Sequence, residues 1–259
     1  MDMKKKWITV GDLTIGEGRP KICVPITGRS AEEVLSQANE LAAPAQIAEW
    51  RVDYMDICKD EESLCIDAVL QTGAELKKVL SAAGIPLLFT CRRCVEGGLA
   101  DLNVQAYATL NEKVIHAGFA DLLDIEYSVG EQEAVGLVKE AAGHCATVIS
   151  HHDFEKTEGE DVLVARMKRM EATGADIVKL AVMPQSERDV LTLLSATERM
   201  YKACEVPLIT MSMGKLGVIS RISGATFGSA VTFASEAEAS APGQIPVKEM
   251  DAILRSLSR

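Results

Sequence analysis

A lysine lies in the middle of an apolar segment that is predicted to be a β-strand. Lys179 stands between Val178 and Leu180 in residues 174–185, GADIVKLAVMPQ. The interior of a strand is a poor environment for an ammonium ion, so a lysine there pairs with a carboxylate or loses its proton. Burial beside other cations favours the neutral amine, a nucleophile that forms a Schiff base with a ketone. The alternative is a lysine whose charged head reaches water at a strand end.

Charged residues also end the neighbouring predicted strands. Side chains alternate along a strand, so Glu49 and Arg51 share one face, as do Asp124 and Glu126. An interior that serves only stability is filled with Val, Ile and Leu. The charged residues found here instead indicate a functional site. The alternative is a buried ion-pair network without a catalytic role. The polar residues at these strand ends are Glu49, Arg51, Asp53, Arg92, Arg93, Asp124, Glu126, Ser150, His151, His152 and Asp153.

Two further motifs contain residues that bind metals in other proteins. His151 and His152 are adjacent, and alternation places one of them inside the fold. They have no second ligand pair at a standard spacing, so we expect a catalytic or buried neutral histidine and no metal. Cys91 and Cys94 form a single CxxC, which by itself indicates neither zinc nor redox chemistry.

A glycine-bearing segment near the C-terminal end is predicted to bind an anion. Gly214 and Gly217 precede Arg221 at the start of a predicted helix. Backbone N–H groups at a helix start and a guanidinium suit a phosphate or a carboxylate, and the residues leave that choice open. Further on, Ser240 and Gln244 lie in a loop of small residues, which is either a lid over the substrate or only a connector.

Composition limits the class of protein. The chain has 259 residues, of which 47% are hydrophobic, and a net charge of −11. This length allows a large core, and the negative charge disfavours nucleic acid as a partner. No segment resembles a signal peptide or a membrane span, and seven scattered cysteines are typical of reduced thiols. We therefore expect a cytoplasmic protein that does not associate with membranes.

The remaining pattern predicts the elements that position these residues. A small hairpin at residues 7–15 precedes eight strand-helix repeats. Eight βα units in about 250 residues predict a closed (β/α)8 TIM barrel, formed by residues 1–259 as a single domain. An open doubly wound sheet is the alternative, but its glycine-rich first turn is missing. The expected strands are 21–24, 46–51, 86–92, 120–126, 146–152, 177–182, 207–213 and 229–234, and the expected helices are 30–43, 61–83, 104–116, 131–142, 159–172, 186–204, 218–226 and 246–257.

Taken together, the motifs resemble type I 3-dehydroquinate dehydratase, a shikimate-pathway lyase of aromatic amino acid biosynthesis. The resemblance covers most of the chain and implies dehydration of 3-dehydroquinate through a lysine Schiff base, with no cofactor, in a homodimer. One departure is Pro25, where some members of the family have serine, so we assign Pro25 no ligand contact. The matching segments are 49–53, 87–90 with 92 and 96–98, 150–154, 179–185, 220–221 and 240–244.

The resemblance also implies a role for individual residues. Lys179 would form the Schiff base, His152 would act as the general acid and base, and Glu96 would orient that histidine. The substrate hydroxyls would be held by Glu49, Arg51 and Arg92. The substrate carboxylate would be bound by Arg221, Ser240 and Gln244, which would also close the lid. A set of arginines would help to keep Lys179 unprotonated.

Two other functions fit the residues. A class I aldolase or transaldolase-like enzyme would use the same lysine chemistry on a sugar phosphate held near Arg221. A barrel that binds a small carboxylate without converting it would need neither a desolvated lysine nor a histidine beside it. The dehydratase is therefore the leading hypothesis.

Overall fold

The computed structural model describes residues 6–41, 43–236 and 243–257. Eight parallel strands follow one another around a barrel, with β10 paired to β3 and each later strand to the next as far as β9. The barrel closes through a bridge between Leu208 and Ser229 and a 2.7 Å hydrogen bond from Ala230 N to Leu208 O. The strands are β3 (Lys21–Ile26), β4 (Ile47–Arg51), β5 (Leu87–Thr90), β6 (Leu122–Glu126), β7 (Ala146–Asp153), β8 (Ile177–Val182), β9 (Leu208–Ser212) and β10 (Val231–Ser235).

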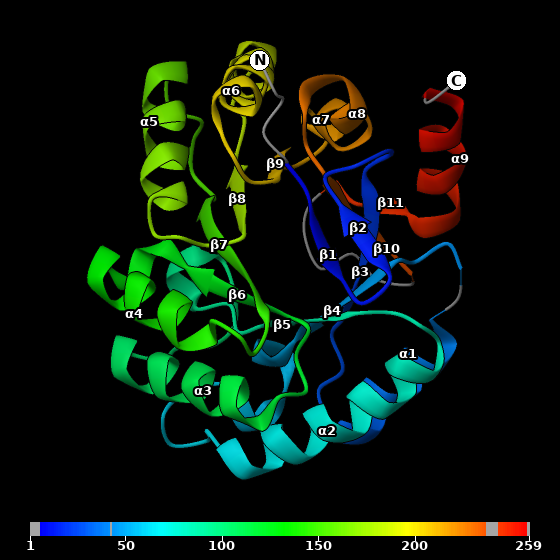
Figure 1. The fold of residues 1–259 in the computed structure, drawn as a ribbon, viewed down its shortest axis with the longest axis vertical. Helices are drawn as coiled ribbons and strands as arrows, with labels where there is room; N and C mark the ends of the chain where they lie inside the picture. Colours follow the sequence, from blue (N-terminus) through cyan, green and yellow to red (C-terminus); the bar gives the residue numbers. More distant parts are fainter. Residues whose placement is uncertain (1–5, 42, 237–242, 258–259) are drawn as a thin grey trace.

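Helices surround this barrel (Figure 1). Several begin at a side-chain cap; for example, Ser186 and Asp189 form a capping box at the start of α6. The helices are α1 (Ala31–Glu40), α2 (Ile66–Ala82), α3 (Val104–Ala117), α4 (Glu131–Ala141), α5 (Glu160–Glu171), α6 (Glu187–Ala203), α7 (Val218–Ile222), α8 (Gly224–Phe227) and α9 (Val247–Leu257). Single 3-10 turns are η1 (Val52–Tyr54), η2 (Asp56–Cys58), η3 (Cys94–Glu96) and η4 (Tyr127–Val129). The predicted (β/α)8 barrel is therefore confirmed.

The apolar core has an outer and an inner part. Outward-facing strand residues pack against the helices around Trp50, whose ring contacts Phe89 and Phe119. The inner part fills the N-terminal half of the barrel with residues such as Ile47 and Ile177. The predicted N-terminal hairpin, β1 (Ile8–Val10) and β2 (Leu13–Ile15), packs onto this inner part through Val10 and Ile15. The N-terminal end of the barrel is thus covered, and polar side chains gather at the other end.

Two details differ from the sequence-based prediction. The helix expected at 218–226 is two short helices, because Ser223 leaves the helical conformation between α7 and α8. A two-residue strand that was not predicted, β11 (Ile245–Pro246), pairs with the end of β10. Within the described parts of the chain, no helix is both long and apolar enough to cross a membrane.

Candidate active site

A cavity of about 170 Å³ opens at the C-terminal end of the barrel strands. Its wall contains cationic, anionic and apolar side chains from six of the eight barrel strands or the segments that follow them. Such a concave mixture of a few polar groups and apolar surface is typical of a small-molecule site. The lining residues are Glu49, Arg51, Arg92, Glu96, Gly97, His152, Phe154, Lys179, Ala181, Met211, Met213, Arg221, Phe233 and Gln244.

The amine of Lys179 lies at the base of this cavity. Its side chain is 4% exposed, and Nζ lies 3.0 Å from Asp124 Oδ2 and 3.5 Å from Glu49 Oε1. The ring of Phe233 lies on another side, with its centroid 4.6 Å from Nζ. The two groups within salt-bridge distance of the amine are carboxylates, which is one of the two possibilities expected for a lysine inside a strand.

Asp124 connects this lysine to Arg92. Asp124 Oδ1 accepts hydrogen bonds from Arg92 Nη2 at 2.8 Å and from Ser150 Oγ at 2.6 Å. Burial alone would raise the pKa of Asp124, but the charges of Arg92 and Lys179 hold it below its usual value. Arg92 also lies 3.2 Å from Glu126 and 3.4 Å from Glu96. The site is thus one network of alternating charges, as the sequence pattern predicts.

His152 is fixed by Glu96. Its Nδ1 lies 2.9 Å from Glu96 Oε2, and its backbone N–H donates to the same oxygen. Burial opposes the charge of Glu96, but the nearby His151, the hydrogen bond with His152 and the charge of Arg92 hold the pKa of Glu96 well below its usual value. Because a carboxylate only accepts hydrogen bonds, Nδ1 must carry the proton. The lone pair of a neutral His152 is therefore on Nε2.

The surroundings of His152 control its protonation. A histidine in water has a pKa of about 6.5. Burial and the charge of Arg92 instead lower the pKa of His152 to about 3, although Glu96 acts in the opposite direction. At neutral pH the imidazole is uncharged and is already in the form that accepts a proton.

Two arginines give the cavity a positive wall. Arg51 makes a bidentate pair with Asp53 at 2.8 and 2.7 Å, and Asp53 also accepts from the backbone N–H groups of Arg92 and Leu99. Arg221, on α7, is 2% exposed, and burial lowers its pKa to about 10. Arg221 is still charged at neutral pH, and its burial shows that it is not a surface arginine. A buried guanidinium at a cavity wall is suited to an anionic ligand group.

The structure brings together eight of the nine predicted site residues. Ser240 lies outside the described residues. Asp124 was recognised in the sequence as a polar strand residue, but it was not assigned to the site. Asp124 and Glu126 are two residues apart on one strand, so their side chains point to the same face. This alternation could have assigned Asp124 to the site. His151 does not line the cavity, although its Nδ1 lies 3.7 Å from Glu96 Oε1.

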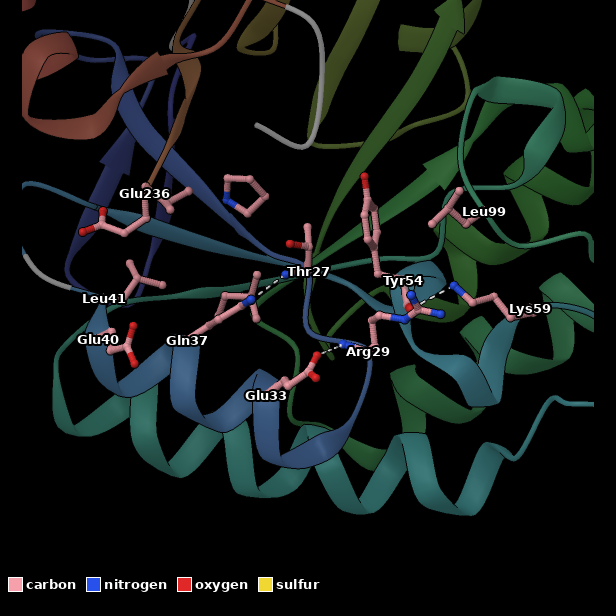
Figure 2. A pocket seen from close by; sticks show the side chains of 13 residues that line it. Thr27, Arg29, Glu33, Gln37, Glu40, Leu41, Tyr54, Lys59, Leu99 and Glu236 are labelled. Atoms are coloured by element: carbon pink, nitrogen blue, oxygen red, sulfur yellow. Dashed lines mark hydrogen bonds between the residues drawn. The ribbon is translucent and has the colours of Figure 1, made fainter. Parts of the chain in front are cut away.

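Figure 2 shows a second and larger cavity, with a volume of about 640 Å³. Helix α1 forms one side through Glu33 and Gln37, and Tyr54 and Leu99 form another. Lys59 projects toward it, but its amine donates to the backbone oxygens of Asp53 and Tyr54. None of the described residues that line it lines the first cavity, and they include no histidine. We therefore place the chemistry in the first cavity. Pro25, to which we assigned no ligand contact, lines the second cavity.

Comparisons with known proteins point to a single family. Residues 22–259 match the family model of type I 3-dehydroquinase. A 3-dehydroquinate dehydratase of Clostridioides difficile is 44% identical over 260 residues, 99% of each chain, and one of Bacillus licheniformis is 43% identical, covering 98% of this chain and 99% of that one. The crystal structure of type I 3-dehydroquinate dehydratase from Clostridium difficile with covalently modified comenic acid has a TM-score of 0.92 and 44% identity, with 99% of each chain covered. A 3-dehydroquinate dehydratase structure from Geobacillus kaustophilus has a TM-score of 0.91 and 38% identity, covering 99% of this chain and 98% of that one.

Proposed function

Because the chain belongs to the type I 3-dehydroquinase family, its reaction is the dehydration of 3-dehydroquinate to 3-dehydroshikimate in the shikimate pathway, and we propose that Lys179 forms the Schiff base in it. The observation that carries this assignment is the buried Lys179 amine at the base of a cavity that also contains a neutral histidine. The two other functions considered, a sugar-phosphate aldolase and a non-catalytic carboxylate binder, would also fit a barrel fold. The chain belongs to neither class of protein, so we do not propose them.

The chemistry follows from the charge of the covalent intermediate. When the Lys179 nitrogen replaces the ketone oxygen, the resulting iminium draws electrons from the adjacent carbon and makes its proton more acidic. We propose that Nε2 of His152 takes that proton and later gives one to the departing hydroxyl. Glu96 would hold the imidazole in the tautomer that leaves Nε2 free.

The remaining wall residues are assigned to substrate binding. We propose that Glu49, Arg51 and Arg92 hold the hydroxyl groups of the substrate, since all three line the cavity near Lys179. Arg221 and Gln244 line the same cavity and would bind the carboxylate. Ser240 is retained as a proposed carboxylate ligand on the family resemblance alone. The ligand is thus a small carboxylate.

Trapping with borohydride tests the role of Lys179. We expect 3-dehydroquinate and borohydride to add the mass of one reduced ligand to the protein and to modify Lys179 in a peptide map. Lys179→Ala should abolish both the adduct and turnover, because among the described residues that line the cavity no other side chain supplies an amine.

Lys59→Ala is the matched control, because this amine faces the second cavity. It should form the adduct as the wild type does. Trapping of Lys179→Ala at the wild-type level, or an unmodified wild-type protein, would contradict the assignment.

Two further properties are proposals that rest on the family resemblance and on the sequence. We propose a homodimer and a cytoplasmic location. Light scattering of the purified protein should give twice the mass of one chain at micromolar concentration, and a single-chain mass at that concentration would argue against the dimer.

A further inference from the structure

We propose that Asp124 is the counter-ion of the Schiff-base nitrogen and is therefore a further catalytic residue. The proposal rests on the assignment of Lys179 as the nucleophile. Asp124 Oδ2 contacts Lys179 Nζ at 3.0 Å, so the carboxylate touches the atom that reacts. Both side chains are almost completely buried, at 1% and 4% exposure, so water screens this pair very little.

The position of Asp124 excludes a role in binding the substrate. Asp124 is not among the residues that line the cavity, whereas Lys179 and Glu49 are. The aspartate therefore lies behind the amine. Glu49 is farther from the nitrogen, at 3.5 Å, and its Oε1 also accepts a hydrogen bond from Thr90. Asp124 is thus the better-placed partner for a charge on this nitrogen.

Its other contacts keep Asp124 charged. Oδ1 accepts from Arg92 and from Ser150, which leaves Oδ2 for Lys179. The charges of Arg92 and Lys179 outweigh the effect of burial and hold the pKa of Asp124 below its usual value. A carboxylate of this kind is a weak base. It stabilises a nearby positive charge and does not exchange protons with it at neutral pH.

The overall balance of Schiff-base formation shows why a fixed negative charge is useful. The lysine ammonium and the ketone give an iminium and one water. Two of the three ammonium protons move to the carbonyl oxygen, the electron pairs that they leave on nitrogen form the C=N bond, and both C–O bonds break as that oxygen leaves as water. The nitrogen carries one positive charge at the start and at the end. One carboxylate in one position can therefore stabilise both states, and it keeps the imine protonated, which is the form that withdraws electrons.

Other charged and titratable groups also face this nitrogen and must be considered in any pH experiment. Glu49 on β4 lies within salt-bridge distance, and Arg92 and His152 belong to the same network from β5 and β7. Below the amine on β3, the Cys23 thiol is buried, and its pKa is raised by burial and by the charges of Glu49 and Asp124. Of the two carboxylates, Asp124 is the nearer to the nitrogen, and asparagine neutralises it with little change in shape.

Asp124→Asn tests the proposal, because it removes the charge and keeps the size of the side chain. We would measure adduct formation with 3-dehydroquinate and cyanoborohydride by intact mass, and kcat, from pH 5 to 9. Without the carboxylate the amine loses its proton at lower pH, so trapping should begin about one pH unit lower or more. The protonated imine is also less stable, so the alkaline limb of kcat should move to lower pH and kcat should fall roughly 10²-fold.

Glu126→Gln is the matched control. Glu126 lies two residues along the same strand, is equally buried and pairs with Arg92 and Arg93, but it does not contact Lys179. It should leave the pH at which trapping begins unchanged. Identical profiles for Asp124→Asn and the wild type would overturn the proposal, as would equal shifts in both variants. Absence of any adduct with the wild type would instead refute the role of Lys179 itself.

A second measurement does not depend on the variant folding. In wild-type protein with 15N-labelled lysine Nζ, the nitrogen shift of the adduct should be that of a protonated iminium from pH 6 to pH 8. A neutral imine at pH 8 would overturn the counter-ion role even if Asp124→Asn does not fold.

Discussion

At the scale of residues, the site works by fixing where protons and charges lie before the substrate arrives. Glu96 is charged and only accepts, so His152 carries its proton on Nδ1 and presents Nε2 to the cavity. Asp124 is also charged and is directed at Lys179. Neither carboxylate needs to change its protonation state at neutral pH, and this is the electrostatic preorganisation that stabilises charged intermediates.

The first prediction at this scale concerns the titration of His152. Its pKa is lowered to about 3, chiefly by burial and Arg92, so the folded protein should hold it neutral from pH 8 to pH 5. An unfolded histidine takes up a proton below about pH 6.5. Because the unfolded state then binds more protons, His152 should reduce the free energy of unfolding as pH falls from about 6.5 toward 3.

Nitrogen NMR of 15N-histidine-labelled protein measures this directly, with His152→Gln used to assign the signal. The Nε2 shift should remain that of an unprotonated nitrogen down to pH 5. A protonation midpoint between pH 6 and 7 would show that burial does not control this histidine.

At the scale of elements, the segment after β5 determines much of the geometry of the site. It carries Arg92 and Glu96, and its backbone is held to η1, the turn after β4, by the hydrogen bond from Leu99 N to Asp53. Gly98 lies against this backbone so closely that an added Cβ would be 2.0 Å from Arg92 O. A glycine at this position allows the segment to turn back onto the strand end.

Gly98→Ala should therefore displace Arg92 and Glu96. A shift of about 1 Å in catalytic groups costs on the order of 10²-fold in rate, so kcat/KM should fall by about that factor. Gly136→Ala is the control, because Gly136 is exposed in α4 and an added Cβ meets nothing within 4 Å. It should leave kcat/KM unchanged and raise stability by about 0.5–1 kcal/mol. A wild-type rate for Gly98→Ala in a steady-state assay would mean that the segment tolerates the shift.

The elements also show what the sequence could and could not predict. All eight strands and the hairpin were placed to within a few residues, because apolar runs, turns and strand-helix alternation are local signals. The break at Ser223 and strand β11 were missed, since both depend on packing around the last strands. The roles of Lys179 and His152 came with the family resemblance. Which carboxylates meet Lys179 could not be predicted, because the charges that meet inside a barrel depend on strand register rather than on spacing along the chain.

At the scale of the whole molecule, the barrel separates stability from chemistry. The charged network lies at the C-terminal end of the strands, and the apolar inner core and the N-terminal hairpin lie at the other end. This division is general for barrel enzymes, in which residues at the N-terminal face serve stability. Changes at the hairpin should therefore affect unfolding and leave the site intact.

Ile15→Ala tests that division. Ile15 is completely buried where β2 covers the inner core, and removing its side chain should leave a cavity among residues such as Ile177 and Ile47. Truncations of this kind cost about 2–5 kcal/mol, so we expect that loss in the free energy of unfolding by urea titration, with an unchanged KM. Thr9→Ala, at an exposed position of β1, should change the free energy of unfolding by less than about 0.5 kcal/mol. A loss of activity in folded Ile15→Ala would mean that the hairpin end and the catalytic end of the barrel are coupled.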